Sequence, residues 1–164
     1  MRQSATRALP IFGRCIDYAQ ALGSPSVSGP AVGNTRLLEE KARRKQWRRA
    51  VGSLRIAASY AAERSVKLAI EPLNRFETDL VNTVGQGLRL IGDIGGDNVG
   101  LLLDTFHMNI EEKDIPAAIT CAAGRIVEFH ASANDRGTPG EDHLPWPKIA
   151  EALRAARYDG PVVI

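Results

Sequence analysis

Three short apolar segments of this 164-residue chain run directly into a residue that can bind a metal ion or transfer a proton. The segments VKLAI, VGLLL and IVEF are followed by Glu71, Asp104 and His130. Two carboxylates and an imidazole form a donor set for a divalent cation, which could stabilise an enediolate as a Lewis acid. Taken singly, each residue has a plainer interpretation as a strand-end cap, an ion-pair partner or a structural histidine. Their shared position makes them candidate metal ligands.

The segments between these strands have the spacing of helices. Apolar residues such as Trp47, Val51 and Leu54 recur at three- and four-residue steps, and Asn82 predicts a helix cap. We predict helices over residues 6–22, 37–64 (with a possible break near Gly52), 82–94, 114–123 and 147–157, a loop over 31–35, and strands over 25–30, 66–70, 99–103, 126–129 and 161–164.

Strands that alternate with helices predict a parallel sheet covered by helices, as in a (β/α)8 barrel. The C-terminal ends of the strands in such a barrel converge on one face, which carries the active site. Glu71, Asp104 and His130 can therefore meet there, although more than twenty positions separate each from the next.

Composition sets bounds on the partners. The net charge is only +2, and the basic run 41–49 (KARRKQWRR) is interpreted as a solvated helix face, because no second basic stretch accompanies it. We therefore expect no nucleic-acid partner. No apolar run approaches membrane-spanning length, so we expect no membrane partner and a cytoplasmic protein. Cys15 and Cys121 lie far apart and are interpreted as small core residues, not as a disulfide.

Three motifs carry a resemblance to a known family. The stretches IEPLNRFET, LDTFHMNIEE and FHASANDRGTPGEDHLPW closely resemble the ketose 3-epimerases of the D-tagatose/D-psicose 3-epimerase group, which belong to the xylose isomerase-like TIM barrels. The resemblance covers the chain from roughly Trp47 to its end. It implies that Glu71, Asp104 and His130 bind a divalent metal, with Mn²⁺ expected before Co²⁺ or Mg²⁺, and that Glu71 is also a catalytic acid/base.

The resemblance also implies how substrate is bound. Glu77, His107 and Arg136 match positions that hold the sugar hydroxyls near the reacting carbons. Epimerisation at C3 of a ketose removes a proton beside a carbonyl and returns one to the opposite face, which calls for a base and an acid on opposite sides of the sugar. The implied partners are a ketose sugar and further copies of the chain in a homo-oligomer.

The chain departs from the family pattern at its ends. The last strand of the family runs into a Glu that serves as a further metal ligand and as the second acid/base, whereas this chain stops at Ile164. Glu141 is not a convincing replacement. We therefore expect residues 1–164 to form one domain truncated at both ends, holding about strands 4–8 of a partial (β/α)8 TIM barrel and lacking the first three β-α units. Such a chain is expected to be weakly active or inactive.

Other functions remain open from the sequence. A hydroxypyruvate isomerase or an aldose–ketose isomerase of the same barrel family would share the metal site and differ in its substrate contacts. A non-catalytic fragment that acts only as a binding or assembly unit is an alternative from another class. An abasic-site endonuclease of related fold would need several more histidine ligands than the three histidines of this chain.

Overall fold

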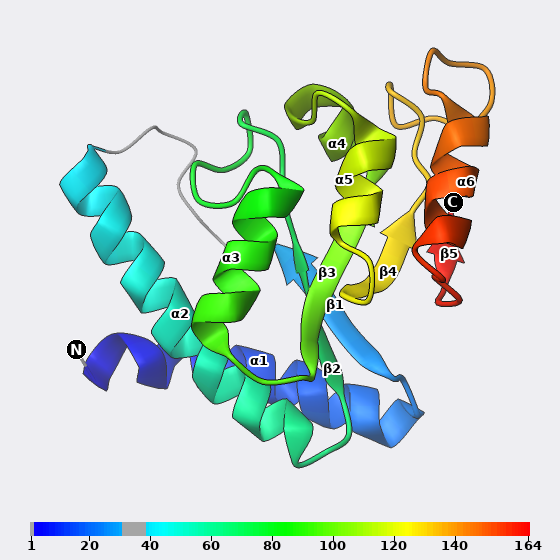
Figure 1. Ribbon diagram of the computed structural model, residues 1–164. Helices are drawn as coiled ribbons and strands as arrows, with labels where there is room; N and C mark the ends of the chain where they lie inside the picture. Colours follow the sequence, from blue (N-terminus) through cyan, green and yellow to red (C-terminus); the bar gives the residue numbers. More distant parts are fainter. Residues whose placement is uncertain (1, 31–38) are drawn as a thin grey trace.

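The computed structural model describes residues 2–30 and 39–164, with side chains from residue 12 onward. Strands and helices alternate along these segments (Figure 1). The elements are α1 (Arg2–Leu22), β1 (Ser26–Pro30), α2 (Glu40–Ala62), β2 (Lys67–Glu71), α3 (Val84–Ile94), β3 (Val99–Asp104), α4 (Thr105–Glu111), α5 (Ile115–Cys121), β4 (Ile126–His130), α6 (Trp146–Ala155) and β5 (Val162–Val163).

The five strands form one parallel sheet in the order β1-β2-β3-β4-β5. Each strand therefore pairs with its neighbours in the sequence, as in a barrel, and the sheet is about half of a (β/α)8 barrel. This confirms the predicted partial barrel. The register places Pro30 beside Glu71 and Asp104 beside His130, so several strands end at the same level. The connections that follow β2, β3 and β4 gather at the upper end of Figure 1.

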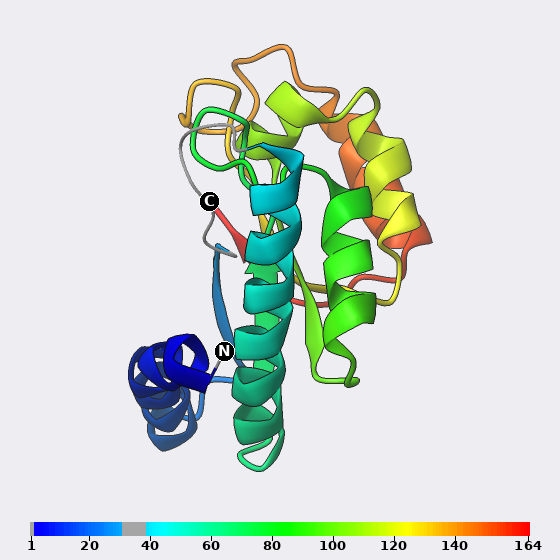
Figure 2. The same cartoon turned by 90° about the vertical axis from the view of Figure 1, so that its left-hand side faces the viewer.

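Helices cover one side of the sheet. Neighbouring contacts link α1 to α2, α2 to α3, α3 to α5, and α5 to α6. In Figure 2, α2 lies in front of the strands, and α3 and α6 follow to their right. Every residue of β3 is buried, as expected for the central strand of a covered parallel sheet. Gly87 of α3 makes this packing close, because a Cβ there would lie 2.7 Å from Leu101 Cδ2.

Most predicted helices and strands are present, with bounds within a few residues of those predicted. The two differences are the cap of α3 and an additional helix, α4. Helix α3 is capped by Thr83 and not by Asn82, because Thr83 Oγ1 accepts a hydrogen bond from the Gln86 amide, while Asn82 Nδ2 donates to two loop carbonyls. Helix α4 was not predicted, since it begins directly after β3 with no intervening loop. Helix α2 is continuous through Gly52, and the predicted loop over 31–35 lies outside the described residues.

Surface predictions can be checked on the same elements. The lysines and arginines of the run 41–49 are all exposed on α2, which confirms a solvated face. The interpretation of Cys15 and Cys121 as core residues was wrong: both are free and exposed, because α1 and α5 turn other residues, such as Ile16 and Ile119, to the core. None of the described helices has the length and apolarity needed to cross a membrane.

Candidate metal centre

Three side chains that could ligate a metal converge at the C-terminal end of the sheet. Glu71 ends β2, Asp104 ends β3, and His107 lies in the first turn of α4. Their candidate ligand atoms all lie within 4.8 Å of one another, and His107 Nε2 is 3.7 Å from Glu71 Oε1. Asp104 and His107 are only 5% and 3% exposed. This is a buried, mixed oxygen and nitrogen donor group, the chemistry that Mn²⁺, Co²⁺ or Zn²⁺ accepts.

Asp104 also caps helix α4, in addition to being a candidate metal ligand. Its Oδ1 accepts a hydrogen bond of 2.8 Å from the Phe106 amide and so caps α4 at the point where β3 ends. One carboxylate oxygen thus starts the helix that carries His107. The strand end and the helix start are joined through a single residue, which fixes the imidazole relative to the carboxylates.

The electrostatics of the group follow from burial of like charges. Burial is the main cause that raises the pKa of Glu71 to about 7, and the nearby Asp104 carboxylate raises it further. Burial also lowers the pKa of His107, which keeps this imidazole neutral near pH 7. The carboxylates of Glu71 and Asp104 repel each other here, and a divalent cation between them would offset both charges.

His130 lies at the edge of this group. Its Nδ1 is 4.0 Å from Asp104 Oδ2, and its Nε2 is 2.9 Å from Glu128 Oε1. The close donor group found among the described residues thus contains His107, whereas His130 lies beside it, next to Asp104. The metal-ligand role of His130 stays a prediction, and a carboxylate that holds the far nitrogen of an imidazole is a common arrangement for histidine ligands.

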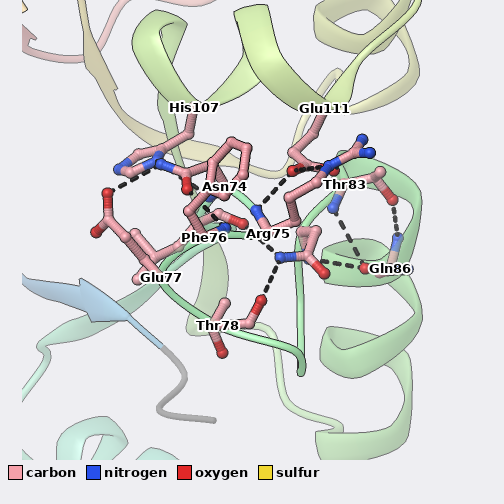
Figure 3. Close-up of polar contacts among 11 residues, drawn as sticks. Asn74, Arg75, Phe76, Glu77, Thr78, Thr83, Gln86, His107 and Glu111 are labelled. Atoms are coloured by element: carbon pink, nitrogen blue, oxygen red, sulfur yellow. Dashed lines mark hydrogen bonds and ion pairs between the residues drawn. The ribbon is translucent and has the colours of Figure 1, made fainter. Parts of the chain in front are cut away.

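His107 is held by the loop that follows β2, as Figure 3 shows. The Asn74 amide donates a 3.1 Å hydrogen bond to His107 Nδ1, and Asn74 Nδ2 lies 2.9 Å from the same nitrogen. Because a backbone N–H can only donate, Nδ1 must accept, and the neutral ring then carries its proton on Nε2. Nε2 is therefore suited to donate a hydrogen bond towards Glu71 or a substrate hydroxyl.

Glu77 and Arg136 contact each other at the C-terminal end of the sheet, which is called the mouth of the half-barrel below. Arg136 Nη2 donates to Glu77 Oε1 at 2.8 Å, and Asn74 Nδ2 donates to the same oxygen at 2.9 Å. The Arg136 guanidinium also lies over the Phe106 ring, 4.0 Å from its centre. Both charged side chains are about half exposed, so they remain accessible to a ligand. The structure thus brings Glu77, His107 and Arg136 together, while their sugar-binding role stays a prediction.

Two residues of the site were missed from the sequence. Asn74 links His107 to Glu77, and Glu128 holds His130. The sequence could have indicated Glu128, because an acid two positions before His130 in a strand lies on the same face of the sheet. Asn74 had none, because the loop that carries it has no periodic pattern.

Comparisons with known proteins agree with this fold. The family description "Xylose isomerase-like TIM barrel" matches residues 2–164. The L-ribulose 3-epimerase of Mesorhizobium japonicum is 40% identical over 154 residues, which are 94% of this chain and 52% of that protein. The D-psicose 3-epimerase of Agrobacterium fabrum is 40% identical over 116 residues, 71% of this chain and 40% of that protein.

Solved structures are similar over almost the whole chain. A structure of L-ribulose 3-epimerase superimposes with a TM-score of 0.90 at 37% identity and covers 96% of this chain and 53% of that one. The D-psicose 3-epimerase from Clostridium cellulolyticum H10, solved with D-tagatose, gives a TM-score of 0.88 at 32% identity over 96% of this chain and 55% of that one. The chain spans about half the length of the curated relatives it matches. It belongs to the xylose isomerase-like TIM barrel family.

Proposed function

We propose that this chain carries the metal-binding and proton-transferring part of a ketose 3-epimerase. The observation that supports this most directly is the convergence of Glu71, Asp104 and His107 at the mouth of the half-barrel, with ligand atoms within 4.8 Å of one another. The relatives that share 40% identity are named as L-ribulose and D-psicose 3-epimerases, so a ketose is the substrate class we assign.

The donor chemistry fits a divalent cation. Asp104 offers a buried carboxylate and Glu71 a partly buried one, and the His130 imidazole lies beside Asp104. We assign these three as the ligands and not His107, because its Nδ1 accepts from the Asn74 amide and its Nε2 carries the proton. Mn²⁺ stays the expected ion, with Co²⁺ or Mg²⁺ as substitutes. The bound ion would polarise the ketose carbonyl and so make the proton on C3 more acidic.

The chain's own residues then divide the remaining work. Glu71 takes the C3 proton from one face of the sugar as a general base. His107 donates a hydrogen bond through Nε2, while Glu77 and Arg136, which already contact each other, bind hydroxyl groups at the mouth. Inversion of C3 also needs a proton delivered from the opposite face, so removal and return of the proton are separable steps.

The experiment that tests this proposal detects proton removal by itself. The 164-residue chain is incubated with Mn²⁺ and D-psicose, L-ribulose, D-tagatose or D-fructose in D2O, and NMR follows deuterium incorporation at C3. We expect incorporation at C3 with one ketose at least, even if the yield of epimer is low. Glu71→Gln is the matched variant and should lower the exchange by about 10²–10⁴-fold, the usual contribution of a positioned base.

Each contrary result identifies another function. Exchange at C1 together with formation of an aldose would identify an aldose–ketose isomerase. Cation and ketose binding without any carbon-bound exchange would contradict the enzyme and favour a binding unit. Failure to bind any divalent cation would contradict the assigned metal centre itself.

A further inference from the structure

Helix α4 holds the loop that follows β2 through two successive backbone amides. The loop, residues 72–83, is called the mouth loop below. His107 Nδ1 accepts from the Asn74 amide, and Glu111 Oε1 accepts from the Arg75 amide at 2.6 Å. His107 and Glu111 are four residues apart on α4 and therefore lie on the same face of the helix. One helix face thus binds two consecutive peptide groups of the mouth loop.

Glu111 adds a paired ion contact to this amide contact. The Arg75 guanidinium donates to Glu111 through Nε at 2.9 Å and through Nη2 at 3.0 Å, an arrangement visible in Figure 3. The Glu111 side chain is only 6% exposed, whereas Arg75 is 62% exposed. A paired contact of this kind is stronger and more directional than a single hydrogen bond. The buried carboxylate is fully used by one residue of the loop.

The next residue holds the other end of the loop. Glu112 Oε1 accepts a 2.7 Å hydrogen bond from the Val84 amide, the first residue of α3. The two adjacent carboxylates therefore hold the mouth loop on both sides: Glu111 binds Arg75 near its start, and Glu112 binds Val84, the residue that directly follows it. The proposed catalytic roles of the previous section use neither of them.

The mouth loop is cross-linked internally, so that it can be held as one unit. The Leu73 amide donates to the Val81 carbonyl, and Asn82 Nδ2 donates to the carbonyls of Leu73 and Thr78. Compact loops whose ends are close together and whose interior is bonded in this way behave as single pieces. Fixing the two ends consequently also fixes Glu77, which the loop presents beside Arg136.

We propose that Glu111 and Glu112 are positioning residues that clamp the mouth loop to α4 and thereby set the placement of Asn74 and Glu77 opposite His107 for binding of a polyhydroxylated sugar. The sugar as ligand rests on the proposed function, whereas the clamp rests on the contacts alone. The carboxylates act on the sugar only through the loop, since their oxygens are already engaged by Arg75 and by the Val84 amide.

The test compares four variants of the full 164-residue chain. Glu111→Ala removes all contacts to Arg75, Glu111→Gln keeps one acceptor oxygen for the amide, and Glu112→Ala releases only Val84. Glu40→Ala is the matched control, because it breaks an exposed Glu–Arg pair with Arg44 on α2, outside the site. If Glu111→Ala does not fold, Glu111→Gln and Glu112→Ala still decide the proposal.

Hydrogen exchange of single amides measures the clamp without any activity. Glu111→Ala should speed exchange of the Asn74 and Arg75 amides by about 10-fold or more, as expected for loss of a hydrogen bond to a charged group. Glu111→Gln should give a smaller change at Arg75, Glu112→Ala should act at Val84, and Glu40→Ala should change none of these amides. Unchanged exchange in the Glu111 and Glu112 variants would overturn the clamp.

Ligand affinity separates positioning from a merely structural role. Glu111→Ala should leave Mn²⁺ affinity within about 2-fold and weaken D-psicose or L-ribulose binding in the presence of Mn²⁺ by about 10-fold. Faster exchange with unchanged ketose affinity would overturn the positioning role. If the unaltered chain binds neither Mn²⁺ nor ketose, the proposed function and its sugar fail together, and the exchange of Asn74, Arg75 and Val84 still decides the clamp.

Discussion

The middle of strand β3 and the segment at its end are both buried, but different interactions stabilise their surroundings. Leu101 and Leu103 pack in an apolar core with helix residues such as Leu90. Asp104 and His107, which follow within a few residues, are just as inaccessible but are charged or polar. The core is stabilised by removal of apolar surface from water, whereas the mouth relies on hydrogen bonds that only offset the cost of burial.

At the mouth, hydrogen bonds between polar groups of different elements offset the free-energy cost of burying them. Thr105 Oγ1 donates to the Ser132 carbonyl and accepts from the Ser132 amide, which ties α4 to the segment after β4. Among the described residues, the one buried side-chain atom without a hydrogen-bond partner is Gln46 Oε1, which is far from the mouth in the sequence. The Glu71 and Asp104 carboxylates repel each other at the mouth, so changes there should affect ligand binding more than folding.

The largest effect on stability is expected in the core. Leu101→Ala should lower the free energy of unfolding by about 3–4 kcal/mol, because Leu101 is fully buried and the surrounding side chains usually fill such a cavity only in part. Urea unfolding of the chain followed by circular dichroism measures the change. A loss below about 1 kcal/mol would show that the half-barrel is loosely packed around β3.

The next largest effect is expected for Asp104→Asn at the mouth, which should weaken metal binding more than it lowers the stability of the fold. Asp104→Asn should weaken Mn²⁺ binding by about 100-fold or more, because loss of even an outer-shell partner of a metal costs about 10–100-fold. It should cost less stability than Leu101→Ala, because the Asn side-chain oxygen can still accept from the Phe106 amide. Calorimetric titration and urea unfolding supply the two numbers. Equal Mn²⁺ affinity in the variant would exclude Asp104 as a ligand.

A stabilising change is expected at Glu71. Without a cation its pKa is about 7 in the folded chain, against 4.5 as the ordinary value. The folded state therefore holds a proton that the unfolded state releases, so the stability of the unaltered chain should fall as the pH rises from about 4.5 to 7. Glu71→Gln should remove this fall and, after an allowance for solvent screening, gain about 1–2 kcal/mol at pH 8.

Urea unfolding at pH 5 and pH 8 in the presence of a chelator checks this. The unaltered chain and Glu71→Gln should be similar at pH 5 and should differ at pH 8. A variant that is less stable than the unaltered chain at pH 8 would contradict the unfavourable burial of a charged Glu71 beside Asp104.

The smallest effect is expected at the outer strand. Tyr158 donates to the Pro161 carbonyl at 2.6 Å and so fixes the chain just before β5. Tyr158→Phe should lower the free energy of unfolding by about 0.5–1.5 kcal/mol, the usual net value of one hydrogen bond. Amide exchange of Val162 and Val163 should rise while that of β3 stays unchanged. Equal changes in both strands would show that the sheet opens as one unit.

The sequence by itself determined the repeating strands and helices and the residues at the strand ends. The apolar runs before Glu71, Asp104 and His130 carry this information locally, because a strand buried on both faces needs a continuous apolar segment. The order of the parallel strands follows as well, since short right-handed connections place successive strands side by side. The motifs then indicated the family that the comparisons confirm.

Only the tertiary structure decided which side chains touch. Helix α4 begins directly after Asp104, the residue that ends β3, so no loop between the two elements indicated it in the sequence. The rotation of α4 turns His107 and Glu111 towards the mouth loop. Asn74 reaches His107 across 33 positions, and Arg136 reaches Glu77 across 59. Such contacts depend on how strand register, helix rotation and loop path combine in space, and no local pattern of residues encodes that combination.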